Sequence, residues 1–92
     1  MSTVAISALV PRRRSTVMGS IVGVMPQVKP WVRLDVELSD GRGSLTLRFT
    51  GRRQIAGMAI GRGLVVDGTP ALVHGQMIVL NPIYSFVTCR DP

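Results

Sequence analysis

The sequence predicts a single all-β domain, and three observations lead to this prediction. Valine and glycine are plentiful, with 10 glycines among 92 residues, and aromatic residues make up only 4% of the chain. Two long segments alternate between apolar and polar residues, as strands with one buried face do. Asp-Gly and His-Gly pairs separate apolar runs, where glycine supplies the positive φ of a tight turn. A chain of this length holds one domain.

Residues 1–14 are predicted to be a basic N-terminal extension of that domain. Pro11 ends whatever structure precedes it, and Arg12, Arg13 and Arg14 then repel one another. We therefore expect a flexible, solvated tail. The alternatives are a basic arm that contacts phosphates and an extra edge strand formed by the apolar run VAISALV.

The first strand of the domain is predicted over residues 15–25. Gly19 and Gly23 lie inside it, and glycine weakens a strand unless the strand must bend or bulge. Two glycines in one strand therefore indicate a sharply coiled strand. The proline-bounded segment PQVKP, residues 26–30, is predicted to be the loop that follows.

The second and third strands are predicted from strict alternation over residues 31–39 and 44–50, joined by the turn DGRG. One face of this hairpin is apolar and consists of Val32, Leu34, Val36, Leu38, Leu45, Leu47 and Phe49. The other face consists of Trp31, Arg33, Asp35, Glu37, Thr46, Arg48 and Thr50. The apolar face is expected to point into the core.

The next segment, residues 51–63, breaks this alternation. It has room for one or two helical turns between glycines, and Ile55, Met58 and Ile60 are available to fill the end of a barrel. We therefore expect a short helical plug between the third and fourth strands.

The last two strands are predicted over residues 64–73 and 76–80, with a tight turn at His74-Gly75. The fourth strand should bend near Pro70, because proline cannot occupy a central ladder. Residues 81–87 are expected to be extended, since Asn81 precedes a proline. In that segment the aromatic side chains are expected to cover the edge of the barrel, with base stacking as the alternative.

The chain thus has three predicted strands, then the helical plug, and then two more predicted strands. This is the layout of a five-stranded OB-fold Greek-key barrel. The predicted barrel spans residues 15–87, and residues 88–92 form a C-terminal tail. We expect the binding surface of such a barrel on the face of the second and third strands and on the loops beside it.

The same residues resemble a known group of proteins. The shared features are Gly19, the block L-x-D-G-x-G-x-L-x-L-x-F of residues 38–49, the block G-x-x-L-x-V-x-G of residues 61–68, and N-P-x-Y of residues 81–84. Over residues 15–87 the chain resembles small bacterial OB-fold nucleic-acid-binding proteins. It is also similar to the wedge OB domain of branch-migration helicases and to anticodon-binding OB domains. The resemblance implies an OB barrel that binds nucleic acid, although OB barrels also dock proteins.

Charge and composition indicate a nucleic-acid partner and argue against catalysis. The formal net charge is +6, and every basic residue except Lys29 is arginine, whose planar guanidinium suits phosphate. One histidine, one cysteine and five scattered acids provide no catalytic constellation and no metal site. We therefore expect a protein that is not an enzyme and has neither a metal nor a cofactor.

The expected compartment is the cytoplasm. Cys89 is the sole cysteine and cannot form an internal disulfide. The N-terminus lacks the order of a secretory signal, and no apolar run approaches the roughly 18–20 residues that cross a bilayer. No membrane partner is therefore expected, and the oligomeric state stays open.

The candidate binding residues are Trp31, Arg33, Arg48, Arg52 and Arg53. In an OB barrel, single-stranded nucleic acid lies across the second and third strands, where aromatic side chains stack on bases and arginines follow the phosphates. Trp31 is expected to stack on a base, and the four arginines are expected to hold phosphates. For Arg52 and Arg53, a solvated position beside the plug is the alternative.

The same face also provides an argument against this function. If Ser39 pairs with Ser44, Asp35 lies opposite Arg48 and partly neutralises it, so a merely solvated sheet face is the alternative. The predicted function is nucleic-acid binding without sequence specificity. A protein-interaction module that does not bind nucleic acid is the second possibility.

Overall fold

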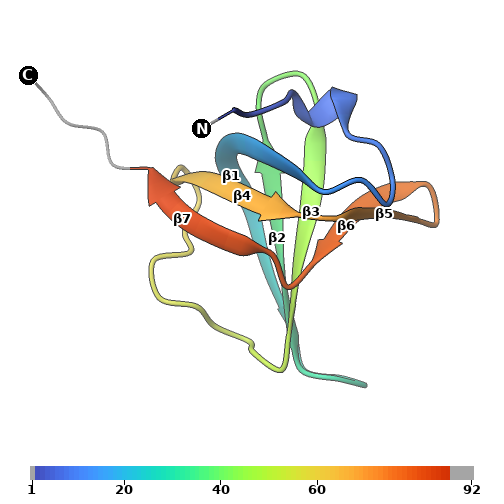
Figure 1. Cartoon of the computed structure of the whole chain (residues 1–92). Helices are drawn as coiled ribbons and strands as arrows, with labels where there is room; N and C mark the ends of the chain where they lie inside the picture. The colour runs from blue at the N-terminus through green and yellow to red at the C-terminus, as the bar shows by residue number, and fades with distance from the viewer. Residues whose placement is uncertain (1, 88–92) are drawn as a thin grey trace, which may run out of the picture.

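A single sheet contains every strand of the described chain, residues 2–87 of the computed structural model (Figure 1). The elements in order are a 3-10 helix η1 (Ile6–Ala8) and the strands β1 (Ser15–Gln27), β2 (Arg33–Ser39), β3 (Ser44–Thr50), β4 (Gly63–Gly68), β5 (Pro70–Val73), β6 (Gln76–Leu80) and β7 (Ile83–Val87). The predicted all-β class is confirmed. Cys89 and the predicted tail of residues 88–92 lie outside the described residues.

Strand β1 is long enough to pair with two neighbours. Its first half pairs antiparallel with β4, and its second half pairs antiparallel with β2. The register shifts between Ile21 and Gly23, near the point at which β1 changes partner. At Gly19 a Cβ atom would lie only 2.7 Å from the carbonyl oxygen of Ser39. Gly19 is therefore tightly packed, and Gly23 lies at the irregularity of the strand, as predicted for a bent or bulged first strand.

The β2–β3 hairpin has the predicted register. Ser39 pairs with Ser44, and Asp35 pairs with Arg48. The inward side chains of both strands are buried and form the centre of the core, together with Ile21 of β1 and Leu64 of β4. The predicted alternation is therefore confirmed with two exceptions. Val32, expected inside, is exposed because β2 begins only at Arg33, and Thr46, expected on the outer face, is buried.

The sheet differs from the predicted five-stranded barrel in two places. The predicted strand of residues 64–73 is divided at Thr69 into β4 and β5, and the extended segment after Pro82 pairs with β4 as β7. The resulting order is β5-β6-β3-β2-β1-β4-β7, with β3 and β6 parallel and the other pairs antiparallel. The sheet is therefore mixed, open and seven-stranded. It does not close, because its two edge strands, β5 and β7, do not pair with each other.

The predicted helical plug is wrong. Residues 51–62 form turns and bends, because Gly57 and Gly61 adopt φ values of 84° and 94° that end any helical turn. Ile55 is nonetheless buried, and Met58 packs against the core, whereas Ile60 is exposed. A loop with two apolar anchors thus takes the place of the helix.

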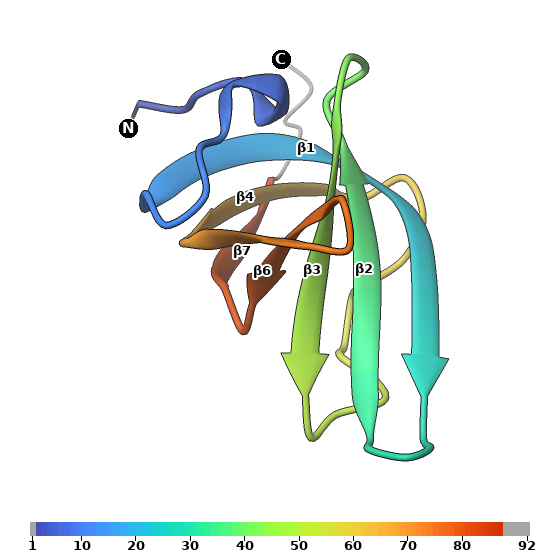
Figure 2. The same ribbon diagram turned by 90° about the vertical axis from the view of Figure 1, so that its right-hand side faces the viewer.

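The N-terminal segment lies against the sheet beside β1 (Figure 2). Ile6 is buried in the core, and its N–H donates to the Asp40 carboxylate at 2.9 Å. Farther along, the Arg12 N–H donates to the Pro70 carbonyl at 2.8 Å. The apolar run of this segment forms η1 and not the edge strand considered as an alternative.

Candidate nucleic-acid interface

A groove lies where the β2–β3 hairpin begins and ends. This end of the two strands is the lower one in Figure 2. Its volume is about 430 Å³, and it is lined by Trp31, Val32, Arg33, Arg48, Thr50 and Gly51. The first residue of β2, Arg33, pairs with the last residue of β3, Thr50, and the Gly51 N–H donates to the Val32 carbonyl at 2.8 Å. Because of this pairing, three of the predicted binding residues line one groove.

Trp31 is the most exposed large apolar side chain of the described residues, with 80% of its surface accessible. It lies in the loop between β1 and β2, which also carries the exposed side chains of Val28 and Val32. An exposed indole ring presents a flat surface on which a nucleic-acid base can stack. The geometry at Trp31 is therefore that of an open stacking surface.

Asp35 organises the two arginines of the groove. Arg48 donates from Nε and Nη2 to the two carboxylate oxygens of Asp35 at 3.0 and 3.1 Å, and Arg33 Nε lies 3.7 Å from Asp35 Oδ2. The hydrogen bond to Asp35 raises the pKa of Arg48. One carboxylate therefore fixes the Arg48 guanidinium and lies within ion-pair distance of Arg33, and these three side chains keep a net positive charge. The predicted cross-strand pair of Asp35 and Arg48 is confirmed.

Arg33 retains an unsatisfied donor. Its Nε–H is buried and has no hydrogen-bond acceptor among residues 2–87, since the 3.7 Å distance to Asp35 Oδ2 is too long for a hydrogen bond. Buried donors without a partner are rare in folded proteins. Charge and packing, and not a hydrogen bond at Nε, hold this guanidinium beside the groove.

A second groove of about 350 Å³ adjoins the first. It is lined by Phe49, Thr50, Arg52, Asn81, Pro82 and Tyr84. Thr50 belongs to both grooves and forms the wall between them. Of the predicted residues, Arg52 lines this second groove, whereas Arg53 is exposed and lines neither groove.

Asn81 fixes the shared wall, and its role was not predicted from the sequence. It adopts a φ of 46° in place of the predicted extended conformation. Its Oδ1 accepts from the Thr50 N–H at 2.9 Å, and its Nδ2 donates to Thr50 Oγ1 at 3.0 Å. The residue type was the one feature of the sequence that pointed to this positive φ, because asparagine tolerates the left-handed region better than most residues. The proline that follows favoured the opposite prediction.

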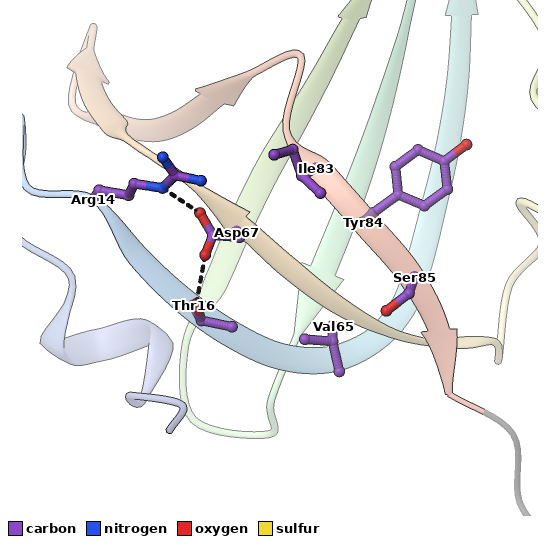
Figure 3. A pocket seen from close by; sticks show the side chains of 7 residues that line it. All are labelled: Arg14, Thr16, Val65, Asp67, Ile83, Tyr84 and Ser85. Atoms are coloured by element: carbon purple, nitrogen blue, oxygen red, sulfur yellow. Dashed lines mark hydrogen bonds and ion pairs between the residues drawn. The ribbon is translucent and has the colours of Figure 1, made fainter. Parts of the chain in front are cut away.

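A third groove lies on the outer face of β1, β4 and β7, and Figure 3 shows its lining residues. At one end Asp67 accepts from Arg14 Nε at 2.6 Å and from Thr16 Oγ1 at 2.8 Å. These two hydrogen bonds lower the pKa of Asp67. Arg14, the only basic residue among residues 2–87 that lines this groove, is therefore paired with a carboxylate.

Within residues 2–87, no three histidine, cysteine or acidic side chains come together as metal ligands do. The same part of the chain contains no helix long and apolar enough to span a membrane. Comparison with protein-family models and with curated protein sequences gives no match.

Proposed function

We propose that the chain binds single-stranded or structured nucleic acid, without reading its sequence, at the end of the β2–β3 hairpin. The observation that carries this proposal is the groove in which the exposed Trp31 adjoins Arg33 and Arg48. A stacked base on an aromatic side chain contributes about 1–3 kcal/mol and is tolerant of sequence. The two guanidinium groups supply the positive charge that the adjoining phosphate needs.

The charge of the whole chain supports the same proposal. A formal net charge of +6 attracts a polyanion and speeds its encounter with the surface. The groove itself keeps a net positive charge, because Asp35 faces two arginines. Asp35 therefore orients the guanidinium groups without cancelling their combined charge.

We also propose that the sheet is a variant of the OB barrel. The support is the meander of β1, β2 and β3, the parallel pairing of β3 with β6, and the hairpin of β5 with β6. If β4 and β5 are counted as one bent strand, β7 is an addition to that arrangement. OB barrels are partly open, and many bind single-stranded nucleic acid on this face.

The proposal is tested by titrating the protein with an unstructured oligothymidylate at low salt, with Trp31 fluorescence as the readout. As the chain contains a single tryptophan, the signal reports on the proposed site. We expect quenching, with an affinity that falls with salt by a slope of about −0.7 per neutralised phosphate. Affinity of the Trp31→Ala variant is measured by anisotropy of a labelled oligonucleotide and should be about tenfold lower, as expected for one lost stacking contact.

Arg42→Ala is the matched control, because Arg42 lies in the turn at the opposite end of the hairpin. It should lower the affinity much less than Arg33→Ala does. Binding that is unaffected by Trp31→Ala, or a flat response to salt, would contradict the proposal.

A protein-interaction module is the second candidate, and exposed apolar side chains favour it. On the outer face of β1 and β7, Met18, Val22, Ile83 and Val87 are all exposed. This function predicts a stable dimer or complex at physiological salt and no retention on immobilised oligonucleotide. Size-exclusion chromatography with light scattering, together with a retention assay, distinguishes the two functions.

A further inference from the structure

We propose that the binding surface continues from the Trp31 groove into the groove of Arg52 and Tyr84, so that its ligand is at least a dinucleotide. One base stacks on Trp31, the next base lies against Tyr84, and Arg52 contacts the phosphate between them. This inference rests on the proposed function and adds a second base position and a phosphate position to it.

The first argument is the shared wall. Thr50 lines both grooves, so a chain that fills the first groove reaches the second by crossing one residue. Two hydrogen bonds with the Asn81 side chain hold Thr50, and the Asn81 N–H donates to the Arg48 carbonyl at 2.7 Å. These contacts join the end of β3 to the turn before β7. The two grooves therefore keep a fixed relation to each other.

The second argument is the aromatic side chain in the second groove. Tyr84 packs edge-to-face between Phe49 and Phe86, with ring centroids 5.5 and 5.8 Å apart. The guanidinium of Arg62 lies 4.3 Å above the Phe86 ring and completes this stack. Tyr84 is only half-buried. Its ring is thus held in one orientation while part of it lines the groove, which lowers the entropy lost when a base packs against it.

The third argument is the charge of Arg52. Among residues 2–87, Arg48 and Arg14 form hydrogen-bonded ion pairs with Asp35 and Asp67, whereas no carboxylate lies within ion-pair distance of Arg52. Arg52 is exposed and lines the second groove beside Thr50. Its guanidinium is therefore available to an anion at the position where the ligand must cross the wall.

The experiment uses thymidylates of one to four nucleotides, with Trp31 fluorescence as the readout for the wild type and for Arg52→Ala and Arg53→Ala. We expect the wild-type affinity to rise about tenfold from one nucleotide to two, as one added stacking contact implies. Arg52→Ala should lose most of that gain. Arg53→Ala removes the same charge from the neighbouring residue outside both grooves, so it should lower every affinity slightly and keep the gain.

Tyr84→Leu is the second variant, because leucine keeps most of the apolar contact with Phe49 and Phe86 while it removes the aromatic ring. Its fold is checked by far-UV circular dichroism. We expect this variant to bind one nucleotide with the affinity of the wild type. Its affinity should not rise when the second nucleotide is added.

Two negative results have different meanings. If no thymidylate quenches Trp31 and no labelled oligonucleotide binds, the proposed function fails, and this inference fails with it. If thymidylates bind but Arg52→Ala and Tyr84→Leu keep the same gain as Arg53→Ala, only the two-groove surface is overturned.

Discussion

Among single residues, Asp35 has the largest influence on the charge of the candidate interface. It forms a two-pronged hydrogen-bonded pair with Arg48 and a looser ion pair with Arg33. Only 14% of the Asp35 side chain and 23% of the Arg48 side chain are exposed, so water screens their interaction incompletely. Its carboxylate thus stabilises the sheet and at the same time reduces the positive charge of the candidate interface.

Replacement of Asp35 by asparagine separates these two effects. Asp35→Asn should lower the free energy of unfolding by about 1 kcal/mol, since Arg48 loses a charged hydrogen-bond partner. Oligonucleotide affinity should rise about two- to fivefold, because a charge near the phosphate contributes about 1 kcal/mol or less in water. Urea unfolding and fluorescence titration measure the two quantities.

Glu37→Gln is the matched control for this experiment. Glu37 lies on the same strand and face as Asp35, and its carboxylate has no hydrogen bond or ion pair with any of residues 2–87. It should leave stability nearly unchanged and raise affinity less. An Asp35→Asn protein that binds oligonucleotide more weakly than the wild type would contradict this expectation and show that the orientation of Arg48 by Asp35 matters more than the charge that Asp35 removes.

At the residue scale, predictions from the sequence succeeded where the pattern was local. Alternation and the Asp-Gly turn set the register that brings Asp35 to Arg48. Neither feature places Asn81 beside Thr50 or Tyr84 beside Phe49, because those contacts depend on how the chain folds back after β6. The first groove was therefore largely predictable, and the second was not.

Among the elements, β1 has a strict steric requirement at one of its two glycines. Gly19 has no room for a Cβ atom, which would meet the Ser39 carbonyl oxygen at 2.7 Å and Leu38 Cγ at 3.0 Å. At Gly23 the added atom would lie 3.4 Å from Glu37 Cβ, an ordinary van der Waals contact. Two glycines in one strand therefore have different roles.

Alanine substitutions at these two positions test that difference. Gly19→Ala should destabilise the protein by about 1–3 kcal/mol, as overpacking against backbone does. Gly23→Ala should be neutral or stabilising by up to about 1 kcal/mol, since alanine loses less conformational entropy in a strand. Denaturation in urea followed by circular dichroism gives both values. Equal losses at the two positions would show that β1 does not pack against Ser39 as described.

The elements predicted correctly are those with a strong local pattern. Strands β2 and β3 followed from alternation, and the turn at His74-Gly75 followed from the residue pair. The helical plug was wrong because positive φ at Gly57 and Gly61 outweighed the apolar spacing. Strand β7 was not predicted as a strand, because its formation depends on the distant edge of β4.

For the whole molecule, two carboxylates attach the N-terminal segment to the sheet. Backbone N–H donors of Ile6, Gly43 and Arg42 lower the pKa of Asp40, and hydrogen bonds from Arg14 and Thr16 lower the pKa of Asp67. A carboxylate whose pKa is lower in the folded state stabilises the fold above its unfolded pKa, near 3.9, and this contribution disappears as the pH falls through the folded value. The two attachments therefore weaken together in acid.

We therefore expect the free energy of unfolding to fall as the pH drops below about 4, where the unfolded state binds protons more readily than the folded state. Asp40→Ala should be less stable than the wild type at pH 7 and should depend less on pH in the acid range. Urea unfolding at a series of pH values measures this dependence. If Asp40→Ala and the wild type show the same slope below pH 4, Asp40 does not hold the segment as described.

The double pairing of β1 connects the candidate interface with the far side of the molecule. Because one strand supplies ladders to both β2 and β4, an opening that displaces the whole of β1 breaks both ladders at once. A ligand that binds only the folded state raises the opening free energy by about 2.7 kcal/mol at a concentration 100 times its Kd. Slower hydrogen exchange should then reach amides in β4, although no residue of that strand lines either groove of the proposed site. Regions that exchange through such shared opening form one cooperative unit.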